Sequence, residues 1–178
     1  PVSSKESGYL SFSEFNLEVD ETVLTKADPA GDNYSIVIYD AEGTQVAAMT
    51  YAQVSDNNDM ITLPAGSYTL VARSLAGEVP AASWENPIYG TTKEFTIRAG
   101  ETTALGELVC TLVQCKVTVS YSDDFLASVT GEGKTSVEVT AGYPLDYQLS
   151  ANGTYDQSAG FFAVNGNTMK VEFKGIIN

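Results

Sequence analysis

Histidine is absent from the 178-residue chain, which removes the side chain that most often acts as a general base or a metal ligand. Basic residues are scarce as well, with nine Lys and Arg against 23 Asp and Glu and a formal net charge of −14. Such an acidic surface repels phosphate backbones and anionic lipid head groups, so we expect no nucleic-acid binding and no direct electrostatic membrane binding. The favoured interpretation of the negative charge is that it keeps the protein soluble. The functional alternative is that it attracts cations or basic partners.

Only two cysteines are present, Cys110 and Cys115 in VCTLVQC. An extended chain would separate them by about 16 Å, whereas a disulfide needs Cα atoms within about 7 Å. No Gly, Pro, Asn or Asp lies between them to turn the chain. We therefore expect two unbonded thiols, both buried as small hydrophobic side chains, and too few cysteine ligands for a metal site.

Signatures of catalysis and of nucleotide binding are missing too. The chain has no G-x-S-x-G motif, and GEGKTS from Gly131 has its glycines two apart, not five as in a phosphate-binding loop. Among the 23 acidic residues, spacing singles out no pair for glycoside hydrolysis. No run of 18 apolar residues could form a membrane-spanning helix. We predict a protein that is not an enzyme, with no catalytic residue, no metal and no cofactor.

What the chain does contain is apolar–polar alternation with a period of two, which is typical of half-buried strands. The clearest runs are NYSIVIYD (33–40), SYTLVARS (67–74), CKVTVSY (115–121) and TMKVEFK (168–174). Turn sequences rich in Gly, Asn, Asp and Pro separate such runs, and the best helical candidate is the short TYAQVSDNN from Thr50. The pattern predicts an all-β protein with almost no helix, made of two antiparallel β-sandwich domains in tandem.

A domain boundary is expected near Gln114, where the apolar phase of the strands changes. We predict a seven-stranded β-sandwich over 1–113 and a second β-sandwich over 114–178, which would be incomplete at its C-terminus. In YLSFSEFNLEV (9–19) the apolar phase slips between Phe12 and Phe15, which indicates a bulge or a switch between sheets. This segment is expected to lie at a sheet edge or seam.

The segment ITLPAGSYTLVARS (61–74) predicts a tight hairpin. Pro64 fixes φ, Gly66 permits a left-handed residue, and Tyr68 begins the next strand facing the core. Such LPxGxY hairpins resemble those of transthyretin-like and related immunoglobulin-like seven-stranded sandwich modules, in which the motif is architectural.

A wider resemblance rests on the order of five segments: GYLSFSEFNLEVDETVLTKA, YSIVIYDAEG, LPAGSYTLVARS, NPIYGTTKEFTIRAGETT and CKVTVSYSDDF. This order resembles a family of Bacteroidales surface lipoproteins of unknown function, which is similar to fimbrillin-type pilus subunits and anchors. The resemblance implies export and display at the outer membrane through a lipid on a cysteine upstream of Pro1. It also implies partners that are other surface or pilus subunits, joined by β-strand addition.

The same resemblance assigns a candidate processing site to Lys26 and Ala27, because fimbrillin-type precursors are cut at a Lys/Arg–Ala bond in this region. Cleavage there would free a groove for a donated strand. Here a lysine stands in place of the more typical arginine. The alternative is a solvated lysine in a loop.

A candidate ligand-binding loop lies in VPAASWENPIYG (79–90), which holds the only tryptophan. Trp84, Glu85, Asn86 and Tyr89 combine aromatic rings with amide and carboxylate groups, which suit stacking on sugars and bonding of their hydroxyls. The favoured alternative is that Trp84 and Tyr89 plug the open end of the sandwich. Two acidic stretches, 56–59 and Asp123–Asp124, are interpreted as polar turns because the calcium-loop pattern is missing.

Together these features predict a non-enzymatic cell-surface lipoprotein with a structural or adhesive role, related to fimbriae. The alternative is a glycan-binding module of a surface polysaccharide-utilisation system. A glycan array with a Trp84→Ala control separates the two.

Overall fold

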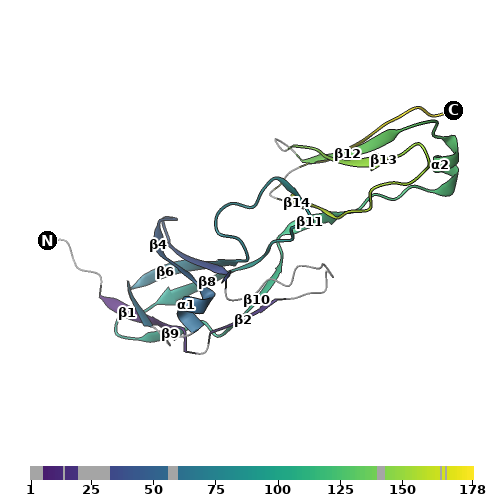
Figure 1. Ribbon diagram of the computed structural model, residues 1–178. Coiled ribbons are helices and arrows are strands. Elements are labelled where there is room, and N and C mark those ends of the chain that lie inside the picture. Colours follow the sequence, from purple (N-terminus) through teal and green to yellow (C-terminus); the bar gives the residue numbers. More distant parts are fainter. Residues whose placement is uncertain are drawn as a thin grey trace. The chain divides into compact units, whose positions relative to one another are not determined.

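The computed structural model describes residues 6–13, 15–19, 33–55, 60–139, 143–164, 166 and 168–178. The chain divides into two compact units (Figure 1). Unit 1 consists of Pro1–Glu78 and Ile88–Val113, and unit 2 of Val79–Pro87 and Gln114–Asn178. The segment 79–87, which the sequence analysis placed in the N-terminal domain, therefore packs with unit 2. The fold is nearly all-β, as predicted, with two short helices among the described residues.

Unit 1 contains two sheets. The larger sheet has the strand order β2-β10-β8-β6-β3-β4, and the smaller has the order β5-β1-β9. Not all pairs are antiparallel, because β1 pairs in parallel with β9 and β2 in parallel with β10. The elements are β1 (Ser7–Ser11), β2 (Asn16–Val19), β3 (Ser35–Asp40), β4 (Gln45–Thr50), α1 (Tyr51–Ser55), β5 (Met60–Pro64), β6 (Gly66–Arg73), β8 (Tyr89–Ile97), β9 (Thr102–Ala104) and β10 (Glu107–Leu112).

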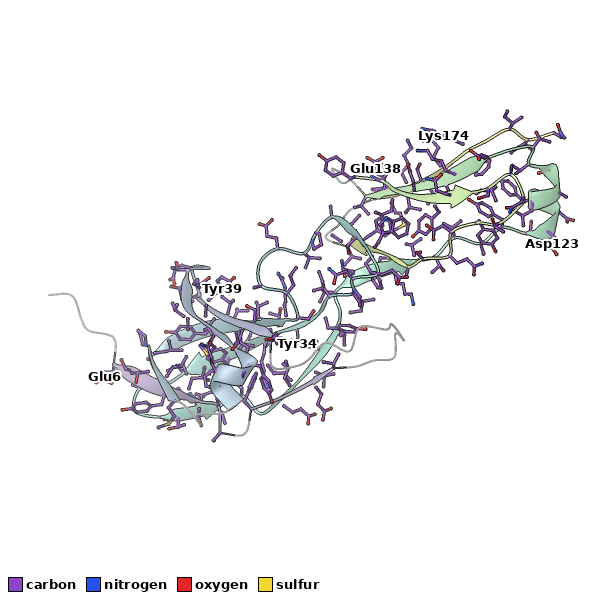
Figure 2. The ribbon with its side chains drawn as sticks, viewed as in Figure 1. Glu6, Tyr34, Tyr39, Asp123, Glu138 and Lys174 are labelled. Carbon is purple, nitrogen blue, oxygen red and sulfur yellow. The ribbon has the colours of Figure 1, made fainter. Side chains whose placement is uncertain are left out.

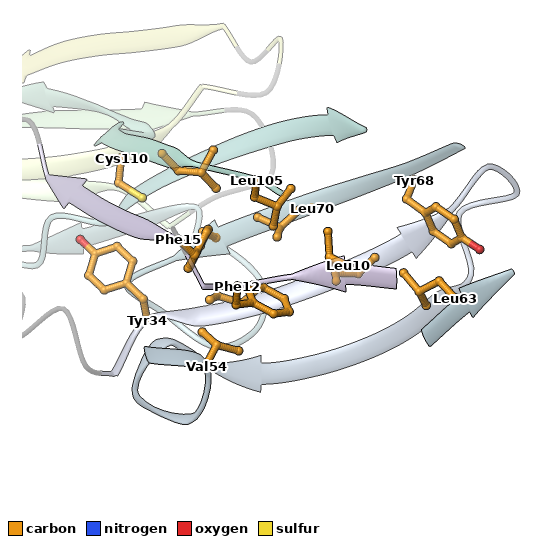
Figure 3. Close-up of a cluster of buried hydrophobic side chains, with 14 of the residues drawn as sticks. Leu10, Phe12, Phe15, Tyr34, Val54, Leu63, Tyr68, Leu70, Leu105 and Cys110 are labelled. Atoms are coloured by element: carbon orange, nitrogen blue, oxygen red, sulfur yellow. The ribbon is translucent and has the colours of Figure 1, made fainter. Parts of the chain in front are cut away.

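Both sheets of unit 1 contribute to one buried core (Figure 3). The larger sheet supplies alternate residues such as Ile36, Ile38 and Leu70, and the smaller sheet supplies Leu10 and Leu63. The predicted alternation is confirmed in β3 and β6, where every second side chain is buried. Two sheets over a shared core give a sandwich-like arrangement.

The phase slip in the first strand segment is a switch between sheets. β1 lies in the smaller sheet, where it pairs with both β5 and β9, and β2 forms an edge of the larger sheet. Between them the backbone turns, with the Phe15 amide donating to the Phe12 carbonyl at 3.0 Å. Both phenylalanines are buried, and their rings meet edge to face at 5.5 Å. The expected edge position thus applies to β2, whereas β1 is a central strand.

The predicted hairpin at Pro64–Gly66 is wrong. β5 pairs with β1 in the smaller sheet, whereas β6 pairs with β3 and β8 in the larger one. The connection is therefore a corner between sheets, and Gly66 is not among the residues with positive φ. Tyr68 does face the core, and its hydroxyl donates to the Pro64 carbonyl at 2.7 Å, which ties the corner to the strand that follows it.

Unit 2 also contains two sheets, with the strand orders β11-β14-β7 and β13-β12-β15. Its core includes Val137, Leu145, Tyr147 and Phe162. The elements are β7 (Ala82–Trp84), β11 (Gln114–Val117), α2 (Asp123–Ser128), β12 (Gly133–Val139), β13 (Leu145–Leu149), β14 (Gly160–Ala163) and β15 (Met169–Lys174).

The Asp123–Asp124 segment, interpreted above as a polar turn, is the first turn of the helix α2. The Ser122 hydroxyl caps this helix by accepting from the Phe125 amide at 3.2 Å. Carboxylates in the first turn also suit the positive end of the helix dipole. Phe125 stacks on Tyr121 at 5.3 Å, so the helix covers an aromatic cluster.

The two cysteines are both free, as predicted, but only one is fully buried. Cys110 has no exposed surface, and burial raises the pKa of its thiol to about 11. Cys115 is half-buried, so the expectation of two buried thiols holds for Cys110 alone. Within the described ranges, neither helix is long and apolar enough to cross a membrane. No group of three or more Cys, Asp or Glu side chains there is placed to hold a metal ion.

Candidate functional site

The outer face of the six-stranded sheet in unit 1 is a candidate surface. In β3 the alternation sends Ile36 and Ile38 into the core, which leaves Ser35, Val37 and Tyr39 on the opposite face. The same rule leaves Ser67, Thr69, Val71 and Arg73 of β6 on that face, because Tyr68, Leu70 and Ala72 are buried.

Strand register brings three of these outward positions into one row. Tyr39 lies opposite Thr69 in the β3–β6 pair, and Thr69 lies opposite Glu94 in the β6–β8 pair. Directly opposed side chains on one face have Cβ atoms about 4.5–5.5 Å apart. An aromatic ring, a hydroxyl and a carboxylate therefore stand side by side on three neighbouring strands. We call this set the Tyr39 row.

A hollow of about 590 Å³ lies over the Tyr39 row. Tyr39 also borders a second hollow of about 260 Å³, which extends toward Arg73. Figure 2 shows Tyr39 at the margin of unit 1. The larger hollow is lined by Tyr39, Asp40, Ala41, Gly43, Ser67, Tyr68, Thr69, Glu94, Phe95 and Thr96.

The turn after β3 forms a rigid wall of this hollow. The Asp40 carboxylate accepts from the Thr44 amide at 2.8 Å and from the Glu42 amide at 3.1 Å. The Asp40 amide donates to the Thr44 carbonyl at 2.9 Å, and Gly43 has a positive φ of 79° that the turn requires. A turn held by these bonds keeps Asp40 in place beside Tyr39.

Acidic groups set the electrostatics of the hollow. Burial raises the pKa of the Tyr68 phenol, and the nearby charges of Asp40 and Glu42 raise it further. Glu94 adds another carboxylate to the lining of the larger hollow. A site with these groups repels anions, whereas carboxylates and threonine hydroxyls accept hydrogen bonds from neutral hydroxyl groups.

Residues 79–87 of the loop predicted from sequence belong to unit 2, and three consecutive residues among them are exposed. Trp84 ends β7 with 37% of its surface exposed, and its ring meets the Tyr147 ring edge to face at 4.8 Å. Glu85 has a positive φ of 47°, and no other non-glycine residue that the structure describes has a positive φ. Its amide donates to the Ala159 carbonyl at 2.9 Å, and the Ala159 amide donates to its carboxylate at 3.3 Å. Asn86 is exposed beside them.

The structure does not bring Tyr89 to this loop surface. Tyr89 is the first residue of β8 in unit 1, and its ring is buried in the core of that unit. Its amide donates to the Ser74 hydroxyl at 3.0 Å, and its carbonyl accepts from the Ser74 amide at 2.9 Å. Lys26 and Ala27, the predicted processing site, lie outside the described residues.

The sequence analysis missed the Tyr39 row. One sequence signal does point to this row. In SIVIYD, SYTLVARS and TTKEFTI, the positions that alternate with the core residues face outward, and they are rich in Ser and Thr. Binding residues concentrate in loops, whereas these positions lie on strands and carry no motif.

Comparison with known protein families matches residues 6–177 to a family described as a domain of unknown function (DUF4493). The chain belongs to the DUF4493 family. This membership agrees with the expectation of a family without an assigned function. The link to fimbrillin-type proteins stays a prediction. Curated proteins give no match.

Two solved structures illustrate what this DUF4493 chain is similar to. One is a candidate adhesin from Bacteroides ovatus, with 12% identity and a TM-score of 0.44, aligned over 95% of this chain and 67% of that one. The other represents candidate polysaccharide-binding proteins (DUF1812) from Bacteroides thetaiotaomicron. It has 11% identity and a TM-score of 0.47, over 94% of this chain and 76% of that one.

Proposed function

We propose that this protein is a non-enzymatic surface protein with an adhesive role, which binds a neutral glycan in the hollow over the Tyr39 row. The observation that carries the proposal is the hollow of about 590 Å³ on the outer face of the six-stranded sheet. A ring and several hydrogen-bonding groups line it on rigid strands, which is the composition of a binding site.

The chemistry of the Tyr39 row suits a saccharide. A tyrosine ring offers an apolar face for the C–H side of a sugar, and its hydroxyl offers a polar end. Thr69 and Glu94 stand beside the ring and can bond the sugar hydroxyls. Because Asp40 and Glu94 line the hollow, the expected glycan is uncharged and neither sulfated nor uronic.

A glycan array on the intact protein tests this proposal. Tyr39→Ala is expected to weaken binding roughly fivefold or more, because loss of a ring that stacks on the ligand costs about 1 kcal/mol or more. Tyr143→Ala is the matched control, since it removes a tyrosine that is 90% exposed in unit 2. Trp84→Ala tests the loop predicted from sequence. Loss of binding in Trp84→Ala but not in Tyr39→Ala would show that the glycan site lies in unit 2 and not over the Tyr39 row.

A second candidate function is β-strand addition between subunits, with Lys26–Ala27 as the proposed processing site. It is supported by the N-terminal segment that precedes this site, in which β1 supplies the buried Leu10 and the turn between β1 and β2 supplies the buried Phe12 and Phe15. Burial of these three side chains contributes on the order of 5–9 kcal/mol before entropy is subtracted. After a nick, the segment should therefore stay bound until another strand replaces it.

Limited trypsin digestion followed by native mass measurement tests strand addition. The expected result is cleavage after Lys26, retention of the N-terminal peptide by the nicked chain, and polymers when subunits are mixed. If trypsin cuts other lysines but not Lys26, the processing site is not accessible and the proposal is contradicted. A nicked protein that sheds the peptide without forming polymers would contradict strand exchange.

Outer-membrane display through a lipid on an upstream cysteine is a further part of the proposal, and it rests on the sequence resemblance. The test uses the full-length gene product in cells, with metabolic labelling by an alkyne fatty acid and protease shaving of the surface. A product that is neither labelled nor cleaved on intact cells would contradict it.

We also propose that units 1 and 2 are separate β-sandwich domains. This part of the proposal is supported by the separate cores of the two units. Two calorimetric transitions are expected. A single transition that every core mutation shifts equally would argue against independent domains.

A further inference from the structure

β15 forms an edge of the second sheet of unit 2, and its inner side is partly uncovered. In the described part of the chain it pairs with β12 alone. Val171 lies opposite Val137 in this ladder, yet Val137 has no exposed surface and Val171 is 62% exposed. Ile176 and Ile177 beyond the strand are 68% and 54% exposed. An edge with exposed apolar side chains is a template for another strand.

The opposite side of β15 carries alternating charges. The Glu172 carboxylate lies 3.4 Å from the Lys170 ammonium and 3.6 Å from the Lys174 ammonium. All three side chains are exposed, and Figure 2 shows Lys174 at the margin of unit 2. This local strip contrasts with the net charge of −14 for the whole chain, which otherwise opposes self-association.

The charges discriminate between two of the registers in which two copies of β15 could pair antiparallel, the one centred on Glu172 and the one centred on Val171. A pair centred on Glu172 would place Glu172 opposite its own copy and Lys170 opposite Lys174. Like charges directly opposite each other destabilise a strand pair. This register is therefore disfavoured.

A pair centred on Val171 has the opposite character. It places Lys170 of each copy opposite Glu172 of the other, which gives two complementary charge pairs by symmetry. The two Val171 side chains face each other, and Met169 lies opposite Phe173. Opposite charges and apolar pairs at facing positions both stabilise a strand pair.

We propose that β15 pairs antiparallel with β15 of a second copy of this chain, centred on Val171, so that two three-stranded sheets become one six-stranded sheet. Such an interface is isologous and closes as a dimer. It covers the exposed Val171 and removes two free sheet edges. The proposal is independent of the glycan site in unit 1.

Charge reversal tests the register, with sedimentation velocity over a concentration series as the readout. Lys170→Glu and Glu172→Lys are each expected to weaken dimerisation roughly tenfold or more, because each places like charges opposite each other twice. The double swap of both residues should restore the dimer, and an equimolar mixture of the two single variants should form heterodimers. Lys116→Glu and Glu132→Lys make the same charge changes elsewhere in unit 2 and should leave the dimer unchanged.

A cysteine placed at Val171 tests the symmetry axis independently. In a Cys115→Ser background, Val171→Cys should form an intermolecular disulfide under mild oxidation. Facing residues have Cα atoms about 4.5–5.5 Å apart, which a disulfide can span. Lys174→Cys should not cross-link, because it faces Thr168 of the other copy.

Circular dichroism and Trp84 fluorescence establish that each variant is folded, and the mixing experiment gives a readout even where a single variant is less stable. A protein that stays monomeric throughout the concentration series would overturn the proposal. So would a dimer that neither single reversal weakens, or a double swap that fails to restore it. Equal cross-linking of Val171→Cys and Lys174→Cys would also overturn it.

Discussion

Tyr147→Phe removes one hydroxyl from the centre of unit 2. Tyr147 has no exposed surface, and burial raises the pKa of its phenol. The hydroxyl donates to the Val117 carbonyl at 2.9 Å and accepts from the Gly160 amide at 3.2 Å. It therefore joins β13 of one sheet to β11 and β14 of the other.

The cost of this change follows from the two groups that it leaves without a partner. An unsatisfied buried donor or acceptor costs about 1–3 kcal/mol. Two such groups should destabilise unit 2 by about 2–6 kcal/mol. For a unit of this size, with an m-value near 1 kcal/mol/M, the urea midpoint should fall by about 2 M or more.

Tryptophan fluorescence is a selective assay for unit 2. Trp84 is the only tryptophan of the chain, and it lies in unit 2 against the Tyr147 ring at 4.8 Å. Urea unfolding followed at this residue therefore reports unit 2 without a contribution from unit 1. Tyr155→Phe is the matched control, since its hydroxyl makes no hydrogen bond to another described residue.

If the urea midpoints of Tyr147→Phe and Tyr155→Phe agree within error, the stabilising role assigned to the Tyr147 hydroxyl is refuted. Gly160→Ala provides a second test, because a Cβ at Gly160 would lie 2.4 Å from the Tyr147 hydroxyl oxygen. Part of that clash disappears in Tyr147→Phe. The two changes should therefore destabilise unit 2 by less together than the sum of their separate effects.

Three further predictions concern the strands and thiols. Gly8→Ala should destabilise unit 1 by about 3 kcal/mol in thermal unfolding, because its Cβ would lie 2.1 Å from the Arg98 carbonyl oxygen; near-wild-type stability would contradict the placement of β1. Iodoacetamide should modify Cys115 in the native protein and Cys110 only after unfolding, which peptide mass spectrometry resolves. Cys110 should contribute a loss of about 2 kcal/mol in the stability of unit 1 as the pH rises from 9 to about 11, because its thiol ionises first in the unfolded chain; an equal loss in Cys110→Ala would contradict this.

Period-two alternation predicted the strands and much of the core, because it records directly which side of a sheet is buried. Ile36, Ile38 and Leu70 are buried as the pattern requires. The phase slip between Phe12 and Phe15 was equally informative, because a change of buried face within one run requires a bulge or a change of sheet. These signals are local and need no knowledge of the partner strand.

Long-range pairing was not predictable from the same signals. Pro64 and Gly66 indicate a change of direction, but they do not say whether the next strand returns along the same sheet or enters the other one. Helix α2 was missed because its six residues are too few for a helical period to emerge. The capping serine Ser122 ahead of Asp123 was the signal that could have revealed it.

At the candidate site, strand register and not a sequence motif determines which residues become neighbours. Tyr39, Thr69 and Glu94 are far apart in the sequence and become neighbours only through two strand pairings. A shift of one residue in β3 would exchange the faces, so that Tyr39 entered the core and Ile38 faced the hollow.

The β3–β4 register shifts between Ile38 and Tyr39, whereas the β3–β6 register is unbroken across the same two residues. Bulges bend a strand and re-aim the side chain beside them. The extra residue is Val46, because Ile38 pairs with Ala47 and Tyr39 with Gln45, so β4 is the strand that bends. Tyr39 is held in place by regular pairing on its β6 side. That combination puts a ring at the margin of a hollow on an otherwise regular sheet, at a position that no loop motif marks.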